Sequence, residues 1–147
     1  MPDLTSIAAH SRFHCGPAGL AYNETAFRHF LNVDRSRAQR AGRFLYLVLV
    51  AMRESIGRRA RLSDATASAV FRGLGAAVRE VDFVGWFHEG RVAAAVLSQG
   101  AKTTDHVASV VAERILAALR SELSGPQASR VRLRVIRLGG GAINLTS

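Results

Sequence analysis

Apolar residues along the chain follow two different spacings, which predict alternating helices and strands. The stretch Arg43 to Met52 is almost continuously apolar, as expected of a central strand that is covered on both faces. The stretch Arg130 to Leu138 alternates arginine with aliphatic residues, which is the two-residue period of a strand with one face in water. The spacing of a helix is present in residues 23–42, 63–79 and 103–125.

Two further strands are predicted at residues 82–87 and 91–97. They are joined at Glu89-Gly90, where glycine can supply the positive φ of a tight hairpin. The predicted order is therefore α-β-α-β-β-α-β in a single α/β domain. Residues 1–21 are small and polar, with glycine and proline close together, so we predict a flexible N-terminal leader followed by a folded domain at 22–147.

The composition agrees with one folded domain and adds a strong bias toward arginine. Of the 147 residues, 48% are hydrophobic, which is enough to build one core. The formal net charge is +9, and Lys102 is the only lysine among the 20 basic residues. Because arginine pairs with phosphates and stacks on bases, this bias favours nucleotide or nucleic-acid partners. A GC-rich genome would produce the same bias.

Cysteine content and hydropathy favour a cytoplasmic protein. Cys15 is the only cysteine, so no intrachain disulfide can form, and a reducing compartment is expected. No apolar stretch is long enough for a membrane span, and the N-terminus lacks the basic-then-apolar order of a secretory signal. His10, His14 and Cys15 have a spacing compatible with metal ligands, but no fourth ligand lies nearby in the sequence. We therefore predict no metal site.

The predicted hairpin and the residues before it resemble those of the GGDEF (diguanylate cyclase) family. Arg79-x-x-Asp82 is followed by five residues and then by a degenerate signature turn. The positions of this turn are His88, Glu89, Gly90, Arg91 and Val92. Asp64 at a helix start and residues 111–115 fit the same frame, and the resemblance extends over roughly residues 23–138. It implies an α+β sandwich, with a central, mainly antiparallel sheet flanked by helices.

The resemblance also implies that catalysis is lost. Cyclases of this family hold two magnesium ions on an aspartate that ends the first strand and on an acidic residue of the hairpin, and these ions neutralise the reacting triphosphate. Here the first strand ends at Met52 without a carboxylate, Gly90 and Arg91 replace two acidic positions, and His88 replaces a glycine. Glu89 is the only carboxylate left in the turn. We predict no enzyme activity, no catalytic residue, no metal and no cofactor.

A second site of the family has counterparts in this sequence. The family's Arg-x-x-Asp segment binds the product, cyclic di-GMP, together with a further helical arginine, and the matching residues are Arg79, Asp82 and Arg114. Arginine suits the phosphates and the guanine rings, while a carboxylate accepts from the N1 and N2 donors of guanine. A purely structural interpretation stays open, with Arg79 at a helix C-terminus, Asp82 in a local salt bridge and Arg114 covering a helix flank.

The sequence thus favours a non-catalytic receptor that binds cyclic di-GMP and signals to an unidentified effector protein. A ligand-independent module for protein interaction or dimerisation is the alternative. Nucleic-acid binding ranks last, because the basic stretches lack interleaved aromatic residues or a known binding motif. The closing helix and hairpin of the family are missing after Leu138, so we expect an exposed sheet edge, which a homodimer would cover.

Overall fold

The computed structural model describes residues 10–15, 19–53, 60–78, 82–98 and 105–139. The strands are β1 (His10–His14), β2 (Leu20–Tyr22), β3 (Phe44–Met52), β4 (Phe83–His88), β5 (Val92–Ser98) and β6 (Val131–Gly139). The helices are α2 (Glu24–Ala41), α3 (Asp64–Ala77), α4 (Asp105–Glu122) and α5 (Gly125–Ala128). Along the chain, each of the four sequence-predicted strands and three sequence-predicted helices has a counterpart among these elements.

The strands form one six-stranded sheet in the order β1-β2-β4-β5-β3-β6. All neighbours are antiparallel except β2 and β4, which run parallel and pair at Tyr22 and Gly85. β3 lies between β5 and β6 and pairs with both over most of its length, which explains why its sequence is continuously apolar. The prediction of an α+β fold with a mainly antiparallel sheet is confirmed.

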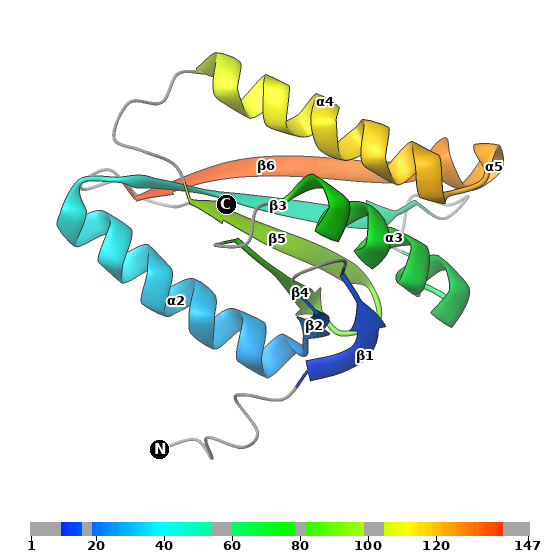
Figure 1. Ribbon diagram of the computed structural model, residues 1–147, viewed down its shortest axis with the longest axis horizontal. Coiled ribbons are helices and arrows are strands. Elements are labelled where there is room, and N and C mark those ends of the chain that lie inside the picture. The colour runs from blue at the N-terminus through cyan, green and yellow to red at the C-terminus, as the bar shows by residue number, and fades with distance from the viewer. Residues whose placement is uncertain (1–9, 16–18, 54–59, 79–81, 99–104, 140–147) are drawn as a thin grey trace.

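Helices cover both faces of the sheet, as Figure 1 shows: α2 lies on one face, and α3 and α4 lie on the other. Alternate residues of β3 point to opposite faces. Leu45 and Leu47 belong to the hydrophobic cluster under α2, whereas Tyr46 and Val48 belong to the larger cluster under α3 and α4. The sheet therefore separates two cores.

The ends of two helices follow signals that are visible in the sequence. The side chain of Asn23 accepts a hydrogen bond from the backbone N–H of Ala26 at 2.8 Å and caps the start of α2. Gly42 ends α2 in the left-handed conformation, with a φ of 67°. Ser63 caps α3 by accepting from the N–H of Thr66 at 3.2 Å. The predicted ends at Gly42 and Ser63 are confirmed.

The strands β1 and β2 differ from the sequence prediction, because they occupy residues that we expected to form a flexible leader. Phe13 of β1 stacks on Phe71 of α3 at 5.7 Å between ring centroids, and its ring lies 6.0 Å from that of Trp86. The segment lies so close to α3 that a Cβ on Gly75 would be 2.0 Å from the carbonyl oxygen of Cys15. These tertiary contacts order residues whose local sequence has no strand signal. Residues 1–9 and 16–18 lie outside the described ranges.

Two smaller features complete the comparison with the sequence. The short helix α5 was not predicted; Ser124 caps its start in a capping box that includes Gln127. No helix within the described ranges has the length and apolar character needed to cross a membrane.

The thiol of Cys15 is buried, which predicts slow reaction with alkylating reagents. Its side chain is 1% exposed, its Sγ donates to the carbonyl oxygen of Gly19 at 3.1 Å, and burial raises the pKa of its thiol. Because the thiolate is the reactive form, we expect iodoacetamide to alkylate the native protein at least about tenfold more slowly than the urea-unfolded chain. Equal rates in the two states would show that β1 and β2 do not shield the thiol.

The same group gives a pH dependence with a definite sign. The folded state keeps the thiol proton to higher pH than the unfolded chain does. The contribution to the free energy of unfolding is therefore complete below the ordinary thiol pKa of about 8.5 and declines as the pH rises above it. Urea unfolding at several alkaline pH values checks this expectation, and Cys15→Ala, which lacks the titrating group, should show a shallower decline.

Candidate functional site

The turn between β4 and β5 is fixed to the start of α2. Gly90 has a φ of 76°, as expected of the glycine in this hairpin. The backbone N–H of Glu24 donates to Oε1 of Glu89 at 3.1 Å, and the N–H of Glu89 donates to Oε1 of Glu24 at 2.6 Å. A helix N-terminus favours negative charge, so Glu89 is stabilised where it lies. The one carboxylate of the turn is thus directed toward α2.

The end of β3 and the turn are linked to the segment that precedes α3. The N–H of Ala60 donates to the carbonyl oxygen of Met52 at 2.8 Å, and that of Leu62 donates to the carbonyl oxygen of Gly90 at 2.8 Å. Within the described ranges, no three His, Cys, Asp or Glu side chains are grouped so that they could hold a metal ion. The turn and the end of β3 are therefore both held by backbone hydrogen bonds to residues 60–62.

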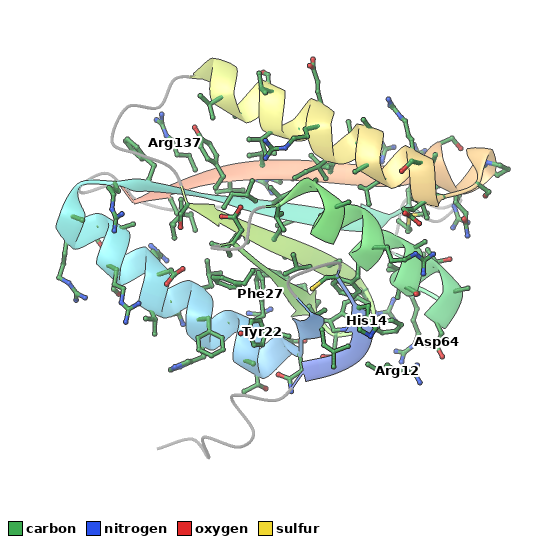
Figure 2. The ribbon with its side chains drawn as sticks, viewed as in Figure 1. Arg12, His14, Tyr22, Phe27, Asp64 and Arg137 are labelled. Atoms are coloured by element: carbon green, nitrogen blue, oxygen red, sulfur yellow. The ribbon has the colours of Figure 1, made fainter. Side chains whose placement is uncertain are left out.

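A cleft of about 630 Å³ lies between this turn and the start of α3. Arg12 of β1 forms an ion pair with Asp64, the residue that matched the family's helix start, and the two side chains lie together in Figure 2. The guanidinium of Arg61 lies near Gly90, and Phe13 and Trp86 also line the cleft. β1 thus supplies residues to this cleft that the sequence analysis did not assign to any site.

The residues predicted to bind cyclic di-GMP lie in three different situations. Asp82, just before β4, is 4% exposed, and its Oδ1 accepts a hydrogen bond from the backbone N–H of Ser98 at 3.1 Å. Arg114 is exposed on α4. Arg79 lies outside the described residues. The three-residue site therefore stays a prediction, and the contact of Asp82 with β5 gives that residue a structural role in addition.

A second depression, the α2–β6 groove, was not predicted from the sequence. It has a volume of about 580 Å³ and lies between α2 and β6 over the open part of the α2 face. Its basic and amide side chains are Arg28, Asn32, Arg35, His88, Arg132 and Arg134. The alternation of arginine along residues 130–138 was the available signal, but alone it indicated only a wet face. The groove also requires α2 to lie beside β6, and the alternation along β6 gives no information on where α2 lies.

His88 and Val92, at the two ends of the β4–β5 hairpin turn, also border this groove. Nη2 of Arg28 donates to the carbonyl oxygen of Phe87 at 2.7 Å, and Nε donates to the same oxygen at 3.0 Å. Nη2 also lies 3.0 Å from Nδ1 of His88. These hydrogen bonds hold the Arg28 side chain against the end of β4.

Comparisons with known proteins find similarity in structure but not in sequence. No protein-family model matches the sequence, and no curated protein matches it. The GGDEF domain of DgcB from Caulobacter crescentus, solved in complex with c-di-GMP, superposes with a TM-score of 0.61 at 14% identity. That match covers 90% of this chain and 81% of the DgcB chain.

Two further solved structures give the same result. A sensory box/GGDEF family protein from Caulobacter crescentus has a TM-score of 0.62 at 19% identity, and the match covers 84% of this chain and 82% of the other. The FimX GGDEF domain from Pseudomonas aeruginosa has a TM-score of 0.61 at 14% identity, with coverage of 84% and 79%. At these identities the likeness shows the fold alone, and the α+β fold that the resemblance implied is confirmed.

Proposed function

We propose that this domain is a non-catalytic receptor for cyclic di-GMP, which binds through Arg79, Asp82 and Arg114, and that it signals to an effector protein. The observation that carries the proposal is the frame set by the hairpin. Asp82 directly precedes β4, which runs from Phe83 to His88 and leads into the turn, and the resemblance implies this order of product-binding motif and signature turn. The solved complex of DgcB with c-di-GMP, a structural neighbour, supports the choice of ligand.

The chemistry around the turn supports a role without catalysis. β3 ends at Met52, and the two residues before it are Val50 and Ala51, so this strand end has no carboxylate. Glu89 already accepts the N–H at the start of α2. Two-metal phosphoryl transfer needs carboxylates that hold both ions against the triphosphate. Incubation with GTP and Mg²⁺ should therefore yield no cyclic di-GMP, and its formation would contradict this part of the proposal.

The described members of the proposed site have suitable chemistry for a guanine ligand. Asp82 carries a carboxylate, the group that can accept from the N1 and N2 donors of guanine, and its Oδ1 already accepts from the N–H of Ser98. Arg114 is exposed on α4, where its guanidinium can reach a phosphate or stack on a base. Charge-assisted hydrogen bonds of this kind are the strong ones.

Calorimetric titration of the purified protein with cyclic di-GMP tests the proposal. Arg114→Ala and Arg79→Ala should each remove charge-assisted hydrogen bonds worth about 1.5 to 3 kcal/mol, which weakens binding by roughly tenfold or more. The matched control is Arg120→Ala, which removes an equal charge from the exposed surface of α4 and should leave the affinity nearly unchanged.

The possible results test the site assignment and the receptor function separately. Binding that is unchanged by Arg79→Ala and Arg114→Ala would contradict the site assignment. Absence of binding by the unaltered protein would contradict the receptor function and would favour the ligand-independent interaction module. A loss of binding that is equally large in Arg120→Ala would indicate a general charge effect.

A further inference from the structure

The α2–β6 groove combines an apolar floor with basic walls. On the α2 face of the sheet, Leu49 of β3 pairs with Arg134 of β6, and Leu47 pairs with Ile136. Arg35 borders the groove from α2. α2 covers part of this face in Figure 1, and Leu47 is buried in the hydrophobic cluster beneath it. Leu49 and Ile136 line the groove and are only partly buried, so they form its apolar floor.

The charges of this groove are not balanced. Its lining contains four arginines and no aspartate or glutamate. Arg28 is engaged with Phe87, and it also lies 3.4 Å from the carboxylate of Glu24. The other three are Arg35, Arg132 and Arg134, and they have no hydrogen-bond or ion-pair partner within the described ranges. Like charges gathered around one depression repel one another, and an anionic ligand would relieve that repulsion.

The spacing of these cations fits more than one phosphate. Arg132 and Arg134 are two residues apart on the same face of β6, which separates their Cα atoms by about 7 Å. Arg35 lies on the opposite wall. A guanidinium presents a planar fork of donors that matches phosphate oxygens. Three such groups around one floor suit a chain of phosphates better than a single anion.

We infer that the α2–β6 groove binds a nucleoside polyphosphate. The phosphates lie between Arg35, Arg132 and Arg134, and the base lies on the floor formed by the partly buried Leu49 and Ile136. The volume of about 580 Å³ is that of a small-molecule site. An acidic peptide would also pair with the arginines, but the planar arginine forks match phosphate oxygens and favour phosphate.

This groove is separate from the proposed cyclic di-GMP site. His88, which lines the groove, ends β4, whereas Asp82 precedes the first residue of that strand. Six residues of extended chain separate the two positions by about 20 Å. The two sites can therefore be tested independently in the same protein.

Calorimetry with ATP as the probe, at low ionic strength and without magnesium, tests the inference. Replacing both Arg132 and Arg134 with alanine should weaken ATP binding by at least about tenfold, because two charge-assisted contacts are lost. Arg137→Ala is the matched control: Arg137 lies on the same strand but on the opposite face, with its guanidinium 4.9 Å from the ring centroid of Phe44. This control should change the affinity by less than about twofold.

Two further probes separate the contributions of the floor and the walls. Inorganic triphosphate, which lacks a base, should bind at least about tenfold more weakly than ATP, because it leaves the apolar floor in water. Adenosine, which lacks phosphates, should show no binding. Arg114→Ala should keep the ATP affinity, and the double arginine variant should keep the affinity for cyclic di-GMP.

Several results would overturn the inference. Absence of ATP binding, or equal weakening by Arg137→Ala, would show that the groove is no specific site. Triphosphate that binds as tightly as ATP would indicate an adventitious ion only. An oligoglutamate peptide that displaces ATP more effectively than triphosphate does would indicate a surface for acidic proteins. Loss of ATP binding in Arg114→Ala would place the nucleotide elsewhere, whatever the response to cyclic di-GMP.

Discussion

Gly75→Ala should destabilise the protein by about 2 to 3 kcal/mol, which lowers the Tm by roughly 4 to 12 °C for a domain of this size. An added Cβ would lie 2.0 Å from the carbonyl oxygen and 2.1 Å from the carbonyl carbon of Cys15. Both are backbone atoms, so no side-chain rotation relieves the collision, and β1 must move away from α3. Thermal unfolding followed by circular dichroism measures the effect.

The sign of the change in the free energy of unfolding distinguishes the collision with Cys15 from the effect of helix propensity. Alanine is a better helix former than glycine by about 1 kcal/mol, so Gly75→Ala would stabilise α3 if the Cys15 backbone were not there. Gly125→Ala is the control, because a Cβ at Gly125 meets no atom within 4 Å. A stabilised Gly75→Ala variant would show that β1 does not lie against α3. Faster alkylation of Cys15 in this variant would locate the disturbance at the N-terminal strands.

Phe27→Ala should have the largest effect on stability, about 3 to 5 kcal/mol. The ring is 0% exposed, lies 5.4 Å from the ring of Phe83 between centroids, and contacts the position where Gly85 lacks a side chain. Figure 2 shows Phe27 between α2 and the sheet, near Tyr22. Its removal leaves a cavity in the smaller of the two cores, where few neighbours can collapse to fill it.

Urea unfolding followed by the fluorescence of Trp86, the only tryptophan, measures this loss. Phe30→Ala is the comparison within the same helix, because the ring of Phe30 is only partly buried and contacts Tyr22 at 5.0 Å. It should cost about 1 to 2 kcal/mol. If both variants lost equal stability, α2 would not pack on the sheet through the face described for it.

Local sequence signals were sufficient for most of the fold. The buried strand β3, the hairpin with Gly90 and the helix ends at Ser63 and Gly42 each depend on residues close together in the chain, and all were predicted. β1 and β2 could not be predicted in this way. These two strands are held in place by the stacking of Phe13 on Phe71 and by the close approach of the Cys15 backbone to Gly75. Both are contacts between distant parts of the sequence.

The candidate functional residues also divide into those set by neighbouring residues in the sequence and those set by contacts between distant residues. The hairpin could be predicted because Glu89 and Gly90 are adjacent in the sequence, and the structure adds that Glu89 is held by Glu24. The α2–β6 groove was missed because it joins Arg35 to Arg132 and Arg134 across almost a hundred residues of sequence. The site that includes Asp82 depends on the family frame and stays a prediction.

The position of β1 has a practical consequence for preparing shorter versions of the protein. A fragment that began at residue 22, as the sequence alone would suggest, would lose Phe13 and Cys15 and would expose the rings of Phe71 and Trp86 beside Gly75. Exposed aromatic surface of this kind promotes association between copies. Fragments intended for ligand titrations should therefore retain the chain from residue 10 onward, so that self-association is not mistaken for a response to nucleotide.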